Sequence, residues 1–113
     1  MIQKTFSKIE GHRIALAEVS QMDNDPDWVY FNRLNVPPPM RGKGVATQLL
    51  TELTKWADAN GINIYLDINP YGGEGGMSLA QLVMLYHKFG FESVNKQTMT
   101  REARYERNII DAG

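Results

Sequence analysis

The sequence has no cysteine among its 113 residues. A disulfide framework, a zinc site built from thiolates and a cysteine nucleophile are therefore excluded. Histidine is scarce as well, because His12 and His87 are the two that the chain contains. Two histidines do not make a histidine-rich metal site by themselves, so we expect no metal cofactor.

The chain also lacks an excess of charge of either sign. It has 12 Lys and Arg against 13 Asp and Glu, a formal net charge of −1. No broad attraction to nucleic acid or to a membrane surface is therefore implied. No stretch approaches the ~18 apolar residues of a membrane span, and the start, residues 1–4, lacks the apolar run of a signal peptide. We expect a cytoplasmic protein with no nucleic-acid or membrane partner.

The composition that remains is ordinary for a globular protein. Hydrophobic residues make up 42% and charged residues 22% of the chain. A chain of this length predicts one domain, residues 1–113, with a modest core and a charged C-terminal tail over 102–113.

Segment 36–46 is the most informative part of the chain, and it reads VPPPMRGKGVA. The prolines end a preceding strand, because proline has no N–H for a ladder hydrogen bond. The glycines let backbone approach a ligand closely. A following helix starts with unpaired N–H groups and the positive end of its dipole. With the charges of Arg41 and Lys43, the pattern predicts a phosphate-binding turn.

Alternation of apolar and polar residues predicts the strands, and a 3.6-residue period predicts two helices. The second helix has a capping box at its start, because Gln81 follows Ser78 by three residues. The strands are expected at 4–9, 12–22, 28–36, 62–69 and 97–101, with a short one from Phe91. The helices are expected at 43–60 and from Ser78 to Gly90.

Strand 28–36 is expected at the centre of the sheet. Both of its faces carry apolar residues, which is typical of a strand covered on both sides. The helix 43–60 and its short return predict that strands 28–36 and 62–69 are parallel neighbours. Simple alternation assigns the residues to two faces: Tyr30, Asn32, Leu34 and Val36 to one, and Val29, Phe31, Arg33 and Asn35 to the other.

Two loops raise the question of further ligand sites. Loop 23–27 is rich in Asp and Asn, but it lacks the EF-hand spacing, so a plain turn is favoured over a metal site. Loop 70–77 contains four glycines, but no Lys-Ser or Lys-Thr pair follows them. A mobile connector is therefore favoured over a second phosphate loop.

The phosphate-binding turn resembles the acetyl-CoA motif of the GNAT acetyltransferases, Arg/Gln-x-x-Gly-x-Gly/Ala, at residues 41–46. Residues 85–91 resemble the family's second signature, Leu-Tyr-x-x-x-Gly-Phe, and residues 99–101 resemble its last strand. Order and spacing agree over about residues 4–101. The resemblance implies an α/β (α+β) fold with a mixed, mostly antiparallel sheet. A central parallel strand pair would be splayed for CoA, and two main helices would flank the sheet.

The resemblance also implies an activity, acetyl-CoA-dependent N-acetyl transfer directly to a primary amine. The partners would be acetyl-CoA and an amine-bearing small molecule, peptide or protein. Tyr86 would protonate the departing CoA thiolate; its alternative is a core aromatic on the apolar side of the helix. The residues implied in cofactor binding hold the pantetheine arm with backbone groups and the pyrophosphate with the turn: Leu34, Asn35, Val36, Arg41, Gly42, Lys43, Gly44, Val45, Ala46 and Thr47.

Other points stay open at this stage. The general base is not identified; Glu18 and Asp67 are candidates, each with a structural alternative. Leu79 stands where the family often has an asparagine. The family's initial strand and two helices have almost no room here, so the acceptor site is open, completed by a second subunit in a homodimer, or suited to a protein or peptide. A non-catalytic acyl-CoA-binding or interaction module on the same scaffold is the alternative function.

Two other nucleotide-binding patterns fit less well. A Rossmann fingerprint requires a third glycine where the chain has Thr47. A P-loop requires Ser or Thr after its lysine, and Gly44 follows Lys43.

Overall fold

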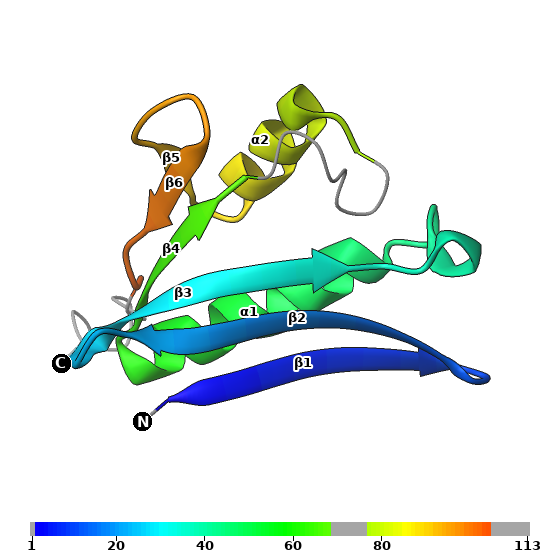
Figure 1. Ribbon diagram of the computed structural model, residues 1–113, viewed down its shortest axis with the longest axis horizontal. Coiled ribbons are helices and arrows are strands. Elements are labelled where there is room, and N and C mark those ends of the chain that lie inside the picture. Colours follow the sequence, from blue (N-terminus) through cyan, green and yellow to red (C-terminus); the bar gives the residue numbers. More distant parts are fainter. Residues whose placement is uncertain (1, 69–76, 105–113) are drawn as a thin grey trace, which may run out of the picture.

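A computed structural model of the protein describes residues 2–68 and 77–104 (Figure 1). The described part forms one sheet with two α-helices and a short 3₁₀ helix, η1. In chain order the elements are β1 (Gln3–Glu10), β2 (Arg13–Met22), β3 (Asp25–Asn35), η1 (Pro38–Met40), α1 (Val45–Asn60), β4 (Asn63–Asp67), α2 (Leu79–Lys88), β5 (Glu92–Ser93) and β6 (Thr98–Arg101).

The sheet has the strand order β1-β2-β3-β4-β6-β5. All neighbours are antiparallel except β3 and β4, which are parallel. The expected mixed sheet with a central parallel pair is therefore confirmed. The two parallel strands pair only from Trp28–Asn63 to Tyr30–Tyr65. Beyond that point β4 turns away from β3 towards α2 (Figure 1), which leaves a gap between the two strands.

Both helices cover the same face of the sheet. Arg101 of β6 bonds to Asp58 of α1 and to the carbonyl of Phe89, the C-cap of α2. Apolar side chains fill the space between the sheet and the helices. They come from the central strands and include Ala15, Ala17, Val19, Val29, Phe31, Leu34, Ile64 and Leu66. On the opposite face of β1 to β4, the side chains are half-buried or exposed.

β3 departs from the alternation that the sequence predicts. Glu18 pairs with Arg33 but Val19 pairs with Phe31, so Asn32 is an extra residue in the ladder. Because this bulge reverses the alternation, the buried face consists of Val29, Phe31, Leu34 and Val36. The predicted face assignment is therefore wrong beyond Phe31. The expectation of a strand covered on both sides is wrong as well.

The ends of several elements also differ from the prediction. β3 starts at Asp25, because Asp23 and Asn24 adopt positive φ and close a tight turn. α1 starts at Val45 because its N-cap, Gly44, is left-handed. The predicted capping box of α2 is confirmed, since Ser78 and Gln81 exchange both hydrogen bonds. The predictions for loop 70–77 and tail 102–113 fall mostly on residues 69–76 and 105–113, outside the described residues.

An ion pair with a buried guanidinium joins both helices to β6. Arg101 is 4% exposed and donates to both carboxylate oxygens of Asp58, at 2.8 and 3.0 Å. Burial favours the neutral form of Asp58, but the hydrogen bond and the charge of Arg101 outweigh this effect. They hold the pKa of Asp58 below its ordinary value, with help from Arg104. Neither helix in the described part of the chain has the length and apolar character to cross a membrane.

Candidate functional site

The turn between β3 and α1 is fixed to the core on one side and exposed to solvent on the other. Met40, at the end of η1, is 2% exposed and holds the turn in the core. The amide of Met40 donates to Pro37 and that of Arg41 to Pro38, at 2.8 and 3.2 Å. Residues 41–44 are exposed. The turn is thus a fixed platform with an open upper surface.

Two glycines give this platform its shape. Gly42 and Gly44 both have φ of +77°, a conformation that other residues rarely adopt. A Cβ atom at either position would meet nothing within 4 Å. Backbone conformation, and not crowding, is therefore what requires glycine at both positions.

The start of α1 carries no side-chain cap. Its N-cap, Gly44, makes no side-chain hydrogen bond, and Gln48 is the first residue to donate back, to the Gly44 carbonyl at 3.0 Å. The preceding N–H groups, at 45–47, therefore have no capping partner in the described part of the chain. α2, by contrast, is closed by its capping box. Amides left open at a helix start, with the helix dipole behind them, attract anions.

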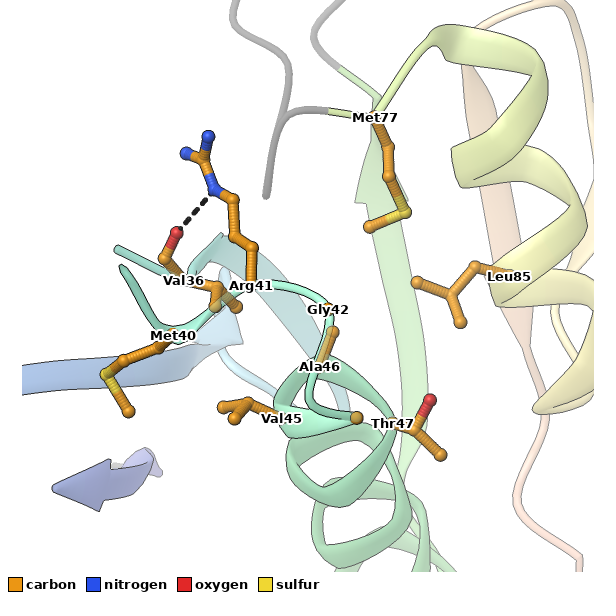
Figure 2. A pocket seen from close by; sticks show the side chains of 10 residues that line it. Val36, Met40, Arg41, Gly42, Val45, Ala46, Thr47, Met77 and Leu85 are labelled. Atoms are coloured by element: carbon orange, nitrogen blue, oxygen red, sulfur yellow. Dashed lines mark hydrogen bonds between the residues drawn. The ribbon is translucent and has the colours of Figure 1, made fainter. Parts of the chain in front are cut away.

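The two cations of the turn point in different directions. Arg41 donates through Nε to the carbonyl of Val36 at 2.9 Å, and the end of its guanidinium extends away from the protein (Figure 2). Lys43 donates through Nζ to both carboxylate oxygens of Glu10, at 3.0 and 3.3 Å. Glu10 lies at the end of β1, 33 residues earlier, and nothing in the sequence pattern indicated this partner.

A cavity of about 200 Å³ opens beside the turn. One wall is the turn with the end of β3, and Met77 and Leu85 face it from the side of α2 (Figure 2). Of the predicted binding residues, seven line the cavity: Val36, Arg41, Gly42, Gly44, Val45, Ala46 and Thr47. The lining also includes Met40, Met77 and Leu85, which were not predicted. The sequence could have indicated Leu85, because it belongs to the second signature at residues 85–91.

Three predicted binding residues do not line this cavity. Leu34 is buried in the core, and Asn35 is exposed at the end of β3. Lys43 lies against Glu10. Leu34 and Asn35 were predicted through their backbone, and their stretch of β3 borders the gap that β4 leaves open.

Tyr86 is 2% exposed and lies in an aromatic cluster of the core. Its ring centroid is 6.0 Å from that of Phe31 and 5.6 Å from that of Phe91. The next residue towards the N-terminus, Leu85, lines the cavity. The structure therefore brings Tyr86 next to the site without placing it in the lining, and its catalytic role stays a prediction.

The two candidate bases lie on the sheet face that carries no helix in residues 2–68 and 77–104. The carboxylate of Glu18 is 3.4 Å from Nε of Arg33, its direct neighbour across β2 and β3. Asp67, at the end of β4, accepts a hydrogen bond of 2.6 Å from the hydroxyl of Thr98. Glu18 is thus already paired with a cation, whereas Asp67 is held by a neutral partner.

The sequence model of the acetyltransferase (GNAT) family matches residues 5–91. No match was found among curated proteins. Among solved structures, the ribosomal-protein-S18-alanine N-acetyltransferase from Escherichia coli is similar, with a TM-score of 0.69 and 15% identity. The similarity covers 94% of this chain and 73% of that one.

Two further crystal structures share the fold. The anti-CRISPR protein AcrVA5 has a TM-score of 0.59 and 18% identity, over 85% of this chain and 96% of that one. A GNAT family N-acetyltransferase (YhbS) from Escherichia coli, solved in complex with CoA, has a TM-score of 0.56 and 21% identity. There the similarity covers 78% of this chain and 51% of the other. At such identities the likeness shows the fold alone.

Proposed function

The chain belongs to the GNAT acetyltransferase family, and we propose that it transfers an acetyl group from acetyl-CoA directly to a primary amine in the cytoplasm. The family match supports acyl-CoA-dependent acetyl transfer in general, and one protein of the same fold was solved with CoA. The observation that carries the proposal is the start of α1. There an uncapped helix end, two left-handed glycines and an adjoining cavity come together.

The turn supplies what a diphosphate needs. The open amides of residues 42–47 would bond to its oxygens, and the helix dipole would add positive charge. Arg41 would add a full charge from the edge of the cavity. The cavity is lined largely by apolar residues, among them Met40, Met77 and Leu85. Such a lining suits the aliphatic part of a pantetheine arm. The free edge of β3 beyond Tyr30 offers backbone groups along that arm.

The reaction forms one bond and breaks another. The amine nitrogen attacks the acetyl carbonyl carbon, a C–N bond forms, and the C–S bond to CoA breaks. The amine loses a proton, and the sulfur leaves as a thiolate that takes one up. An alkyl amine has a pKa of about 10.4 in water, so it must be deprotonated before it attacks. A backbone N–H of β3 would stabilise the carbonyl oxygen as it becomes negative.

Tyr86 is the proposed proton donor to the thiolate. It follows a residue of the cavity lining and lies in a packed aromatic cluster, which would fix the direction of its phenol. Phenylalanine keeps the ring and removes the hydroxyl, so Tyr86→Phe separates the chemical role from packing. We expect turnover to fall by about a hundredfold, while the Kd for acetyl-CoA stays within a factor of about two, since the phenol contributes to the departing sulfur and not to phosphate binding.

The measurements are calorimetric titration with acetyl-CoA and release of free CoA with a panel of primary amines. Wild-type protein is expected to bind acetyl-CoA and to release CoA only when an amine is present. If the protein binds acetyl-CoA but releases no CoA with any amine of the panel, the alternative is supported, a non-catalytic acyl-CoA-binding module. Full turnover of Tyr86→Phe would show that another group protonates the thiolate.

A further inference from the structure

β1 forms one edge of the sheet, and within residues 2–68 and 77–104 no strand lies beyond it (Figure 1). It spans Gln3–Glu10 and pairs with β2 in an unbroken register, without a bulge or a proline. The opposite edge is β5, which is only two residues long, Glu92–Ser93. Short edge strands, bulges and prolines are among the devices that keep a sheet from adding another strand. β5 has such a device, whereas β1 is long and regular.

The backbone groups of β1 alternate between β2 and the free edge. The amide of Gln21, in β2, donates to the carbonyl of Ile2 at 2.8 Å. Because this bond continues the ladder of the two strands, the even-numbered residues of β1 direct their N–H and C=O groups towards β2. The odd-numbered residues Thr5, Ser7 and Ile9 direct theirs away from the sheet. The free edge thus presents donors and acceptors to an added strand.

Ile9 adds an exposed apolar side chain to this edge. At 70%, it is the most exposed of the large hydrophobic side chains in the described part of the chain. Its neighbour Lys8 pairs with Glu52 of α1, and successive residues of a strand point to opposite faces. Ile9 therefore lies on the sheet face away from α1. A strand added to β1 would cover part of it, because directly opposed residues of a ladder bring their side chains into contact.

The charges on the other face of β1 suit a second copy of the same strand. Lys4 and Glu10 lie on this face, near opposite ends of the strand. If two β1 strands pair antiparallel about a two-fold axis at Ser7, Lys4 of each copy lies opposite Glu10 of the other. The next registers that keep the outward backbone groups opposed are two residues away, and they set Lys8 against Lys4 or against Lys8 of the second copy. Like charges directly opposite are destabilising, so the charges favour the register centred on Ser7.

Both charges are available for this contact. Nζ of Lys4 lies 5.4 Å from the ring centroid of Phe6, and Lys4 has no carboxylate partner in the described part of the chain. Glu10 bonds to Lys43, but its side chain is 46% exposed, and a carboxylate accepts more than two hydrogen bonds. A lysine of a second copy therefore fits on Glu10 beside Lys43.

We propose that two copies of this chain form a symmetric dimer through β1, in which the two six-stranded sheets become one continuous sheet. Thr5 and Ile9 of opposite copies exchange backbone hydrogen bonds, as do the two Ser7 residues, about six bonds in all. Lys4 of each copy pairs with Glu10 of the other. The helices of both copies lie on the same face of the joined sheet. The dimer does not depend on the acetyl transfer proposed above.

The test uses two variants of the full chain, Lys4→Glu and Glu10→Lys, studied by sedimentation velocity over a series of concentrations. Wild-type protein should change from monomer to dimer as its concentration rises. Each variant alone sets like charges against each other at both contacts, so its dimer should dissociate about tenfold or more easily. An equimolar mixture of the two variants should form a dimer again, because each contact then joins opposite charges. Recovery in the mixture also shows that both variants are folded.

Lys96→Glu is the matched control. It makes the same change of charge in the loop between β5 and β6, near the opposite edge of the sheet. Because this loop is far from β1, its dimer constant should stay within about twofold of wild type.

Amide hydrogen exchange, followed by NMR, shows which backbone groups the dimer covers. The amides of Thr5, Ser7 and Ile9 should exchange more slowly in dimeric than in monomeric samples, whereas the even-numbered amides of β1 are protected in both. The inference is overturned if wild-type protein stays monomeric, if Lys4→Glu matches Lys96→Glu, or if the mixture is no more dimeric than either variant alone. It is also overturned if these three amides exchange equally fast in monomer and dimer.

Discussion

Lys43 is the residue whose surroundings differ most from what its place in the turn suggests. Its charge stands in the phosphate-binding motif, but its ammonium group bonds to both oxygens of Glu10. An incoming diphosphate must compete with this carboxylate for Lys43. We therefore expect Glu10 to lower the affinity of the turn for anions, by the modest amount that an exposed ion pair allows.

Glu10→Gln tests this competition. We expect the variant to bind CoA about two- to fivefold more tightly at low ionic strength, because Lys43 is released and a negative charge near the turn is lost. The gain should shrink at high salt, which screens exposed charges. Calorimetric titration with CoA at two salt concentrations measures both effects.

Glu52→Gln is the matched control for this experiment. Glu52, on α1, pairs with Lys8 of β1, so the same strand is involved, away from the turn. Its affinity for CoA should equal that of wild type. A Glu10→Gln variant that binds CoA no better than Glu52→Gln would show that the Glu10–Lys43 pair does not oppose binding.

The turn itself was predictable residue by residue, because glycines, prolines and cations act over a few neighbouring positions. Gly42 and Gly44 have the left-handed conformation that such a turn requires. Glu10 and Met77 were not predictable in the same way. Their contacts with the turn or the cavity cross more than thirty positions of the chain, and no local pattern records such a contact.

At the scale of elements, the ion pair of Asp58 with Arg101 joins α1, α2 and β6. Arg101 is almost fully buried and also donates to the carbonyl of Phe89 at 2.6 Å. The amide of Arg104 donates to Asp58 at 2.7 Å, which fixes the chain beyond β6 on the end of α1. Removing the carboxylate leaves a buried guanidinium without its counter-ion, and such a loss is costly.

Asp58→Ala should lower the free energy of unfolding at pH 7 by about 3 kcal/mol. The pKa of Asp58 is lowered in the folded protein. Its stabilising effect is therefore complete above the unfolded-state pKa of about 3.9 and is lost as pH falls through the folded-state pKa. The difference between variant and wild type should thus be largest at neutral pH and should shrink in acid.

Urea unfolding at pH 7 and at pH 3 measures this difference. Glu52→Ala is the control, because its ion pair is exposed and should be worth less than about 1 kcal/mol at either pH. A loss for Asp58→Ala that is the same at both pH values would contradict the role given to the ionised carboxylate.

Element types were predictable from periodicity, but the faces of β3 were not. The prediction assumes that successive residues of β3 point to opposite faces of the sheet. The extra residue at Asn32 breaks this alternation, and it is visible only in the pairing of β3 with β2. For the same reason the sequence suggested that apolar residues cover both sides of β3. Once the bulge is taken into account, its buried apolar residues fall on one face.

At the scale of the whole molecule, the described residues form a helix layer on one face of the sheet and place no helix on the other face. The mixed sheet and its central parallel pair were predictable, because a strand, a helix and a short return allow few arrangements. That both helices share one face was not stated by the sequence. An apolar side on a helix shows that it packs, but not against which face. The start of α1 is where we place the cofactor.

The most direct test of this account is an NMR titration of the protein with acetyl-CoA, which follows the backbone amide signals. The account predicts that the signals of residues 42–47 move most, because their N–H groups bond to the diphosphate. The backbone amide signals of the end of β3 and of Leu85, in the cavity wall, should also move. Acetyl-CoA that binds while the signals of 42–47 stay in place, or that does not bind at all, would contradict it.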